Sequence, residues 1–513
     1  MNKSAGTLAG MIEGVSAQRP DALAIVDGET EITFRQLHER ILATFAALEE
    51  LLSPGVPVAV IGPNHHSWVE LYYAAPASSR MLVFLNHRLH PQELMSMIER
   101  AGAGLVIGDA LELDRLRSVG LDIPMFDWES WSVRTQDVAA NPTLTLSEPD
   151  DIAWLLFTSG TTAAPKGALL SNAGILASVE ASAKARPVDA DDVYVFPFPL
   201  CHVAGYNVVH RHAHGRPVVL LPGFSASTFC DVVEHHRATS TSLAATMLAA
   251  LVDLLEVEPH RLGQLQSLRS IAYGAAPMPT SLLLRADELL DCEFTQGYGM
   301  TELSGNAVFL DAVAHRKGLN GDFALLEAAG RPAPGVELQL VDENGDQVAD
   351  GEVGEIAIRA AQVMSGYLND ESATAAALQD GWLHTGDIGR MVDGLLYVVD
   401  RKKDMVITGG ENVSSLEVEA AVLAHPDVAR VAVVGVPDPT WGENVCAVVV
   451  GVPGVVVDGP AIASFVRASL AGFKSPRHIV VVDELPVTAS GKVVKAELRR
   501  WLAENPEVLG TRL

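Results

Sequence analysis

A stretch rich in hydroxyl side chains and glycine lies between residues 158 and 167, directly after a short apolar run. Hydroxyl and backbone N–H groups in a tight turn can surround a polyphosphate, and a nearby lysine adds a positive charge. The spacing is not that of a Walker loop, which closes on glycine, lysine and then serine or threonine. From composition alone, a polar surface turn stays a fair alternative. The residues that would contact phosphate are Thr158, Ser159, Gly160, Thr161, Thr162 and Lys166.

The segment that must position this turn runs from about residue 150 to 300, and it alternates short apolar runs with helical patterns. This alternation predicts layered α/β structure with largely parallel sheets. Ligands of open α/β sheets bind at the carboxyl ends of strands, where the turns at 158–167 and 274–277 lie. Strands are predicted at Ile152–Phe157, Val193–Phe196, Val218–Leu221 and Ser270–Tyr273, and helices over 226–237, 246–256 and 279–290.

The pattern becomes richer in strands after about residue 330, and a further α+β unit begins near 403. Ser414 and Glu417 form a capping-box pattern that opens the first helix of this unit. The strands after 330 are predicted at Val336–Val341, Glu355–Arg359 and Gly394–Val399. Those of the last unit are predicted near 405–407, 431–436, 445–450 and 478–483, with helices near 415–424, 460–470 and 494–503. The last ~110 residues therefore indicate a compact second domain.

The composition is that of a large and strongly acidic globular protein. The 513 residues exceed the ~100–200 typical of one domain, so at least two domains are expected. Asp and Glu total 64 against 36 Lys and Arg, a net charge of −28, which disfavours nucleic acid and anionic membranes as partners. An anionic substrate must therefore meet a local cluster of donors and cations.

Neither an export signal nor a membrane segment is evident in the sequence. The first 20 residues contain no long apolar run, and no stretch reaches the ~18 apolar residues of a membrane span. The four cysteines show neither CxxC pairing nor metal-ligand spacing, which fits reduced thiols. A cytoplasmic protein without an integral membrane segment is expected.

The order of residues in 158–167 resembles the TSGTTGxPKG motif of the adenylate-forming superfamily. This superfamily includes acyl-CoA synthetases, firefly-type luciferases and peptide-synthetase adenylation domains, and the chain is most like a fatty-acyl-CoA synthetase. Later motifs follow in the family's order, so that the resemblance covers about residues 20 to 500. One departure is Ala163, where the family usually has glycine. Because alanine adopts positive φ poorly, a stiffer or slightly rerouted loop is expected.

Two further segments resemble the family's nucleotide motifs, Gly274–Pro277 beside the adenine and Gln296–Glu302 with its YGxTE pattern. The resemblance implies that Tyr298 lies along the adenine and that Thr301 contacts the α-phosphate. Glu302 would hold Mg²⁺, a hard cation that favours carboxylate and phosphate oxygens, although a surface acid that caps a turn is the alternative. The nucleotide-binding residues of these segments are Gly274, Ala275, Ala276, Gln296, Gly297, Tyr298 and Gly299.

The ribose motifs of the family have counterparts at residues 381–387 and 400–404, which match GWxxTGD and the (D/G)RxKD element. The resemblance implies that Asp387 accepts hydrogen bonds from both ribose hydroxyls, a role that suits an ionised carboxylate. Arg401 would contact the ribose or a phosphate. Lys403 falls at the family's hinge, but a solvated surface lysine would look the same.

The last motif of the family, PxTxxGK, matches Pro486–Lys492. The resemblance implies that Lys492 enters the active site while the substrate carboxylate attacks the α-phosphorus and pyrophosphate leaves. A positioned ammonium stabilises the charge that gathers there. The C-terminal domain would then rotate, and Gly409 and Gly410 would line the approach of the coenzyme A thiol. The implied fold is α/β, with a large N-terminal domain of layered sheets and a β-rich subdomain over residues 1–402, and a small mobile α+β domain over 403–513.

The acid-binding side of the site is implied by Pro199–Gly205, which resembles the family's PxxHxxG. His202 would border the acyl carboxylate or the gate to its tunnel, with a packed core histidine as the alternative. The catalytic set is then Lys492, Thr301, Glu302 and His202. Mostly apolar residues are plausible pocket walls, as expected for a fatty or aryl acid: Tyr206, Thr246, Met247, Tyr273 and Met300. A separate group of histidines fits metal binding or, more simply, a polar helix and loop: His210, His212, His214, His235 and His236.

These features predict an acyl-CoA synthetase that converts a carboxylic acid, ATP and CoA to acyl-CoA, AMP and pyrophosphate through an acyl-adenylate, with Mg²⁺. A medium- or long-chain fatty acid is the first expectation, and an aromatic acid is the alternative. An acyl-AMP ligase or adenylation domain that feeds a carrier protein stays open, although no attached carrier domain is expected after Lys492. A luciferase-like oxygenase and a non-catalytic adenylate-binding protein are also open. The acyl chain length does not follow from the sequence. The oligomeric state does not follow either, and a homodimer is one open possibility.

Overall fold

The structure is a computed structural model that describes residues 6–136, 147–158, 165–274, 278–408, 411–439, 441–487 and 493–509. The chain packs into two compact units. The first holds residues 1–338 and 358–383, and the second holds residues 339–357 and 384–513. The boundary at 402/403 inferred from the sequence concerns a hinge, and it stays a prediction.

The larger sheet of the first unit has nine strands in the order β15-β14-β13-β12-β11-β9-β10-β1-β2. Its central strands pair in parallel, and antiparallel strands close both edges. The largely parallel sheet predicted from alternating apolar runs is confirmed. The strands are β1 (Leu23–Asp27), β2 (Thr30–Thr33), β9 (Tyr194–Phe196), β10 (Val218–Leu220), β11 (Ser240–Leu243), β12 (Ser270–Gly274), β13 (Glu293–Met300), β14 (Gly305–Leu310) and β15 (Arg331–Pro332).

The second sheet of this unit has seven strands in the order β18-β8-β7-β4-β3-β5-β6. From β7 to β6 the pairing is parallel, whereas β7, β8 and β18 pair antiparallel. Strands β3, β4 and β5 are buried along their whole length, because apolar side chains cover both faces of a sheet enclosed by helices. The strands are β3 (Val58–Ile61), β4 (Leu82–Leu85), β5 (Leu105–Gly108), β6 (Met125–Asp127), β7 (Ile152–Thr158), β8 (Lys166–Ser171) and β18 (Gly366–Tyr367).

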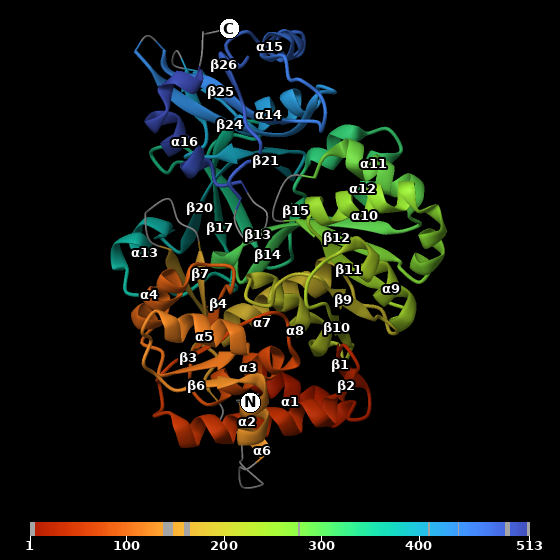
Figure 1. Cartoon of the computed structure of the whole chain (residues 1–513), viewed down its shortest axis with the longest axis vertical. Coiled ribbons are helices and arrows are strands. Elements are labelled where there is room, and N and C mark those ends of the chain that lie inside the picture. The colour runs from red at the N-terminus through yellow and green to blue at the C-terminus, as the bar shows by residue number, and fades with distance from the viewer. Residues whose placement is uncertain are drawn as a thin grey trace. The chain divides into compact units, whose positions relative to one another are not determined.

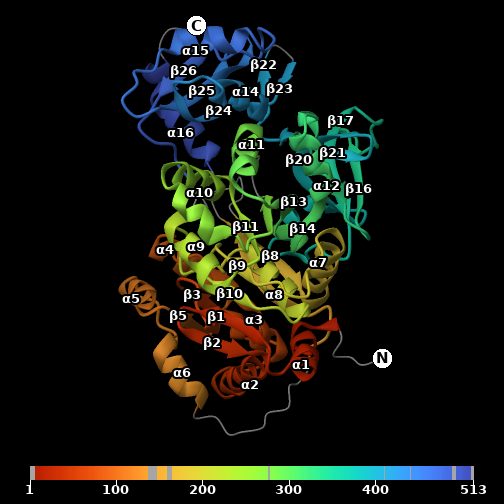
Figure 2. The same ribbon diagram turned by 90° about the vertical axis from the view of Figure 1, so that its right-hand side faces the viewer.

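Helices cover both sheets. Figure 1 shows α9, α10, α11 and α12 side by side next to β11 and β12, over a core that contains Phe229, Leu251 and Phe294. Figure 2 shows α1, α2 and α3 beside β1 and β2. The helices of the unit are α1 (Leu8–Gln18), α2 (Phe34–Leu51), α3 (His66–Ala77), α4 (Pro91–Ala101), α5 (Ala110–Ser118), α6 (Trp128–Gln136), α7 (Asn172–Ala185), α8 (Tyr206–Ala213), α9 (Ala226–His236), α10 (Ala245–Val257), α11 (Thr280–Leu289), α12 (Ala312–Leu319) and α13 (Glu371–Ala377).

Short 3₁₀ turns complete the first unit at η2 (Val203–Gly205), η3 (Pro259–Leu265), η4 (Thr301–Leu303) and η5 (Phe323–Glu327). Two of them, η2 and η4, carry motif residues that the sequence singles out. Within the parts of the chain that the structure describes, no helix is long and apolar enough to cross a membrane.

A β-rich sheet and an α+β region follow, as the sequence predicts. The β-rich sheet has the order β16-β17-β20-β19, with β21 paired to β20. Its strands are β16 (Glu337–Val341), β17 (Val353–Arg359), β19 (Leu378–Gln379), β20 (Trp382–Val392) and β21 (Leu395–Arg401). The α+β region consists of β22 (Val406–Thr408), β23 (Glu411–Val413), α14 (Ser415–Leu423), β24 (Val428–Asp438), β25 (Gly442–Gly451), α15 (Gly459–Arg467), β26 (His478–Val481), α16 (Lys495–Glu504) and η6 (Pro506–Leu509).

Helix α14 begins where the capping pattern predicts. The hydroxyl of Ser414 accepts the N–H of Glu417 over 3.2 Å, which is the first half of a capping box. The Glu417 carboxylate pairs with the ammonium of Lys474 over 2.7 Å. The Glu417 side chain, which the local pattern assigns to the helix cap, therefore forms a long-range ion pair with Lys474 instead.

A buried ion pair lies between α8 and the segment before β9. The guanidinium of Arg211 is 2.7 Å from the Asp192 carboxylate, and both side chains are about 5% exposed. Hydroxyl groups of Thr239 and Ser240 donate to the same carboxylate. The pair and these hydroxyl groups therefore connect α8, the segment before β9 and the start of β11.

Replacement of Arg211 by methionine should lower the free energy of unfolding by about 3 kcal/mol, because Asp192 would keep a buried charge without its cation. Urea unfolding followed by tryptophan fluorescence measures this loss. The matched control is Arg269→Met, which removes a pair with the exposed Asp191 and should change stability little. Equal losses for the two variants would contradict the role of the buried pair.

Candidate active site

The predicted phosphate turn joins β7 and β8, which form an antiparallel hairpin. Thr158 and Lys166 lie opposite each other in the register, so the two ends of the turn meet as cross-strand neighbours. The Thr158 hydroxyl donates to the backbone carbonyl of Lys166 over 3.4 Å. The turn thus starts and ends on one rigid pair of strands, which is the support that a phosphate-binding turn requires.

Lys166 and Glu302 both contact Tyr367. The ammonium nitrogen of Lys166 lies 5.2 Å from the centre of the Tyr367 ring, and the Tyr367 hydroxyl donates to Oε1 of Glu302 over 2.9 Å. Burial, followed by the negative charge of Glu302, raises the pKa of Tyr367 above its ordinary value. The hydroxyl therefore stays protonated and can donate.

Glu302 fits the role of a ligand to a hard cation. The residue is 6% exposed, and no cationic side chain pairs with its carboxylate among the described residues. A buried carboxylate without a cation is costly, and a Mg²⁺ ion bound with substrate phosphates would supply the missing charge. Because Oε1 of Glu302 accepts the Tyr367 hydroxyl, the other carboxylate oxygen of Glu302 is left for a metal.

Thr301 and Glu302 belong to the turn η4, which is held by the segment that precedes β18. The N–H of Met364 donates to the Glu302 carbonyl over 2.8 Å. The turn ends at Ser304, whose φ of 53° is left-handed and whose hydroxyl donates to the carbonyl of Gln362. One backbone hydrogen bond and one side-chain hydrogen bond to a distant segment therefore fix the turn that carries both predicted catalytic residues.

The glycines of the predicted adenine motifs lie where strands approach closely. A Cβ on Gly274 would meet the Gly297 carbonyl at 2.3 Å, and a Cβ on Gly297 would meet the Asn306 side chain at 2.1 Å. Glycine is therefore required here by space. Gly274 ends β12, and Gln296, Gly297, Tyr298 and Gly299 lie in the adjacent β13, so these residues of the two motifs are neighbours.

His202 precedes the turn η2, and its Nε2 atom is buried without a hydrogen-bond partner among the described residues. Burial, followed by the charges of Arg88 and His87, lowers the pKa of His202 to about 4. The ring is thus neutral at neutral pH and can donate or accept a hydrogen bond there. An unpaired buried nitrogen calls for a partner, which fits a ligand-facing histidine better than a packed core one.

The loop that carries His202 is held by Asn64, which sequence reasoning did not single out. Its amide nitrogen donates to the carbonyls of Phe198 and Leu221, and its amide oxygen accepts the N–H of Leu200, each over 2.7 Å. These partners are more than 130 residues away in the sequence. No local pattern marks Asn64, because its function depends on contacts formed only in the fold.

Asp387 and Arg401 face each other on the neighbouring strands β20 and β21 of the second unit. The Nε of Arg401 is 3.2 Å from Oδ1 of Asp387, and Asp387 is 7% exposed. The two predicted ribose-binding residues are therefore brought together as an ion pair. An ionised carboxylate is a hydrogen-bond acceptor only, which suits a partner of hydroxyl donors.

The predicted hinge at Lys403 is tied to α16 by Arg499. The Arg499 guanidinium donates to the Lys403 carbonyl over 3.2 Å and pairs with Asp404 over 2.9 Å. Burial, followed by the charge of Arg401, lowers the pKa of Lys403. The Lys403 residue itself is exposed, so a surface lysine stays the alternative and its role as a hinge stays a prediction.

Part of the predicted site lies outside the described residues: Ser159, Gly160, Thr161, Thr162, Ala163, Ala275, Ala276, Gly409, Gly410 and Lys492. Their roles stay predictions.

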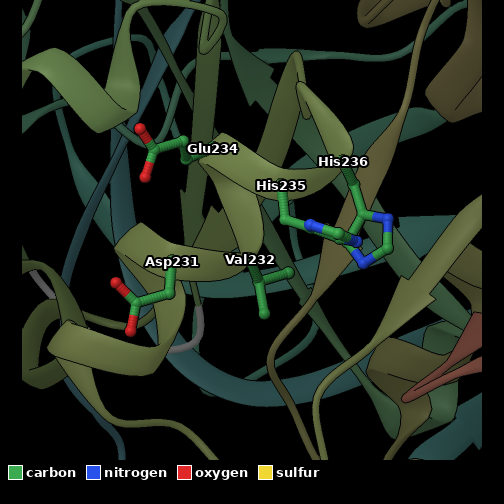
Figure 3. Close-up of a pocket in the computed structure, with 5 residues that line it drawn as sticks. All are labelled: Asp231, Val232, Glu234, His235 and His236. Atoms are coloured by element: carbon green, nitrogen blue, oxygen red, sulfur yellow. The ribbon is translucent and has the colours of Figure 1, made fainter.

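Two of the histidines that could fit a metal site, His210 and His212, make hydrogen bonds within the fold. His212 bonds the Tyr73 hydroxyl and the Ala24 carbonyl, and His210 bonds Arg211. His235 and His236 line a surface pocket along α9 with three further residues of that helix, Asp231, Val232 and Glu234 (Figure 3), and no motif residue lines this pocket.

A group of potential metal ligands does occur at the start of α3. It consists of Asp27, His65 and His66, whose possible ligand atoms lie within 4.8 Å of one another. Within the described ranges it is the only such group of three or more residues. However, Nδ1 of His65 accepts the N–H of Ser67 as a helix cap, and Nδ1 of His66 lies 3.0 Å from the Asp27 carboxylate. These contacts explain the cluster as a device that starts the helix.

The chain belongs to the family of AMP-binding enzymes, the adenylate-forming superfamily. The AMP-binding enzyme family matches residues 12–368, and the AMP-binding enzyme C-terminal domain matches residues 417–492. The chain is accordingly an adenylate-forming acyl- or aryl-CoA ligase by class, as the motif order predicts.

Curated relatives match nearly the whole chain. A feruloyl-CoA synthase of Amycolatopsis is 34% identical over 94% of this chain and 96% of its own length. An indoleacetate–CoA ligase of Aromatoleum aromaticum is 33% identical over 95% and 96%. The fatty acid–[acyl-carrier-protein] ligase ScoC of Streptomyces coeruleorubidus is 31% identical over 93% and 92%.

Solved structures agree with the fold. The o-succinylbenzoate CoA synthetase of Bacillus subtilis, in complex with its acyl-adenylate, superposes with a TM-score of 0.85 at 29% identity over 96% of this chain and 97% of that one. The amide bond synthetase McbA of Marinactinospora thermotolerans gives 0.87 at 30% identity over 96% and 99%. The predicted fold class is confirmed by both.

Asp387→Asn should weaken ATP binding roughly tenfold, because an amide is a poorer acceptor than a carboxylate for the ribose hydroxyls. Calorimetric titration with ATP measures this change. The matched control is Asp393→Asn, an exposed acid at the tip of the same hairpin, which should bind ATP like the wild type. Unchanged ATP affinity in Asp387→Asn would exclude the ribose role.

His202 should make the folded protein sensitive to acid. Below its ordinary pKa of 6.5 the unfolded chain binds a proton that the folded ring refuses until about pH 4, so stability falls as pH drops through this window. His202→Phe should reduce the fall by up to about 1.4 kcal/mol per pH unit, measured by urea unfolding at pH 7, 6 and 5. His235→Phe, at an exposed position of α9, is the control with no expected change. An unaltered slope in His202→Phe would contradict the buried neutral ring.

Proposed function

We propose that the protein joins an aromatic carboxylic acid to coenzyme A, with ATP and Mg²⁺, through an aryl-adenylate. The observation that carries this proposal is the 34% identity to a feruloyl-CoA synthase over nearly the full length of both chains. Ligases for indoleacetate and 2-succinylbenzoate support the same substrate class. The sequence's first expectation, a medium- or long-chain fatty acid, is less well supported than its aromatic alternative.

The site residues suit the first half-reaction, in which a carboxylate oxygen attacks the α-phosphorus and the bond to pyrophosphate breaks. Thr158 and Lys166 would hold phosphate oxygens at the ends of the β7–β8 turn. Thr301 would bond the α-phosphate. Mg²⁺ on Glu302 would offset negative charge on the phosphates. Lys492 would supply the ammonium that stabilises the charge between the two anions.

In the second half-reaction the CoA thiolate would attack the carbonyl of the adenylate, and AMP would leave with the electron pair of the broken bond. No protein nucleophile is required. Burial raises the pKa of the Cys201 thiol to about 12, so the cysteine beside His202 stays protonated. The neutral His202 would donate or accept a hydrogen bond at the acid instead of forming an ion pair with it. Gly409 and Gly410 would line the path of the thiol.

Two relatives are named for acyl acceptors other than CoA. ScoC is named for a carrier protein, and McbA is named for amide bonds. CoA is favoured because the relatives for ferulate, indoleacetate and 2-succinylbenzoate are all named CoA synthases or ligases. The acyl-AMP ligase of the sequence analysis is therefore the second candidate.

A panel of acids separates these functions. Ferulate, benzoate, indoleacetate, octanoate and palmitate are each incubated with ATP, Mg²⁺ and the full chain, with and without CoA, and thioester and pyrophosphate are measured. Aromatic acids should give at least tenfold more thioester per unit time than either fatty acid. Lys492→Ala should abolish acid-dependent pyrophosphate release, whereas Lys184→Ala, which removes an exposed helix lysine, should not.

Three outcomes would contradict the proposal. Faster thioester formation from a fatty acid would restore the first expectation of the sequence. Pyrophosphate release without any thioester would favour the carrier-protein alternative. Full activity of Lys492→Ala would contradict the role of the Lys492 ammonium in stabilising the charge between the two anions.

A further inference from the structure

Tyr367 lies between two groups of opposite charge that the reaction needs separately. We propose that Tyr367 is a positioning residue: its hydroxyl orients the Glu302 carboxylate toward the metal, and its ring keeps the Lys166 ammonium available for phosphate. The inference rests on the proposed function in one respect, the role of Glu302 as a Mg²⁺ ligand. None of the motif residues singled out in the sequence is Tyr367.

The hydroxyl contact constrains Glu302. Oε1 accepts the Tyr367 hydroxyl over 2.9 Å, and the Glu302 residue is 6% exposed. A hydrogen bond to a charged group is stronger than one between neutral groups, so it restricts the rotation of the carboxylate. The other oxygen is then presented in one direction, which a metal with strict octahedral geometry requires.

The ring contact constrains Lys166. The ammonium lies 5.2 Å from the ring centre, within the range in which an aromatic face attracts a cation. This attraction is weaker than an ion pair with a buried carboxylate, so an incoming phosphate can displace it. Within the described part of the chain, no carboxylate pairs with Lys166.

The backbone fixes the tyrosine between its two partners. Strand β18 pairs with β8, so that Tyr367 lies opposite Ala168, two residues from Lys166. On the other side, the N–H of Met364 donates to the Glu302 carbonyl. Residues 364–368 therefore form a strap that connects the lysine strand to the carboxylate turn, and Tyr367 is the side chain of the strap that contacts both.

A physical conflict explains why such a residue is useful. A lysine and a buried glutamate that both contact one side chain would attract each other strongly in a low-dielectric site. Their direct ion pair would neutralise the cation meant for phosphate and the anion meant for the metal. Tyrosine resolves the conflict because one end of the side chain donates to the anion while its face attracts the cation.

The test uses Mn²⁺ binding, followed by electron paramagnetic resonance, to the full chain with α,β-methylene ATP, a non-reacting analogue. Tyr367→Phe should weaken Mn²⁺ binding roughly tenfold, because it removes one hydrogen bond to a charged group. Glu302→Gln should weaken it at least as much. The double variant should bind no more weakly than Glu302→Gln alone, since the hydroxyl acts through that carboxylate.

The ring is tested separately by the affinity for the analogue in EDTA. Tyr367→Phe keeps the ring and should bind the metal-free analogue like the wild type. Tyr367→Leu removes the ring and should bind it about fivefold more weakly, because Lys166 becomes free to pair with Glu302. Thermal unfolding of each variant identifies any loss of the fold.

The matched control is Tyr73→Phe, which removes a buried tyrosine hydroxyl bonded to His212 and leaves the site intact. It should change neither affinity. Wild-type Mn²⁺ affinity in Tyr367→Phe, or losses in Tyr367→Phe and Glu302→Gln that simply add, would overturn the proposal. Unchanged Mn²⁺ affinity in Glu302→Gln would overturn the proposal too, because Glu302 would then not be a ligand of the metal. None of these outcomes depends on the acid or the acceptor, which the acid panel tests.

Discussion

The constraint on which this structure depends is electrostatic: two anions, a carboxylate and a polyphosphate, must meet inside a protein with a net charge of −28. The overall field opposes their approach, so attraction has to come from a few local groups. In each unit one such cation is held by a neighbouring side chain. Lys166 lies over an aromatic ring, and Arg401 lies beside Asp387. Lys166 is therefore kept in place without an ion pair, whereas Arg401 pairs with a buried carboxylate.

The fold serves this constraint by placing short turns at the ends of rigid strands. The phosphate turn starts and ends on paired residues of β7 and β8, and the Thr301–Glu302 turn follows β13 directly. Close strand approach at Gly274 and Gly297 leaves no space for a side chain. Segments far apart in the sequence then fasten the turns, as Asn64 does for the His202 loop and residues 364–368 do for Glu302. The candidate site residues therefore lie on short turns and strand ends that the surrounding fold fixes in place.

Patterns that depend on neighbouring residues were predictable from the sequence. Apolar runs gave β7, β9, β10 and β12 to within one residue at each end, and Ser414 marked the start of α14. Contacts between distant residues were not predictable, because a local pattern carries no information about them. Tyr367 meets Glu302 across 65 positions, Arg499 meets Asp404 across 95, and Glu417 leaves its local capping role for Lys474. The identity of the acid is a question of the same kind, since a pocket is built from side chains that meet only in the fold.

In an adenylate route, the acid becomes joined to AMP before the acceptor arrives. The most direct measurement uses the preferred acid labelled with ¹⁸O in both carboxylate oxygens, followed by mass spectrometry of the nucleotide product. One labelled oxygen should appear in AMP, because the carboxylate oxygen that attacked the α-phosphorus stays on phosphorus when the thioester forms. Unlabelled AMP, or label in ADP or inorganic phosphate, would contradict an adenylate route.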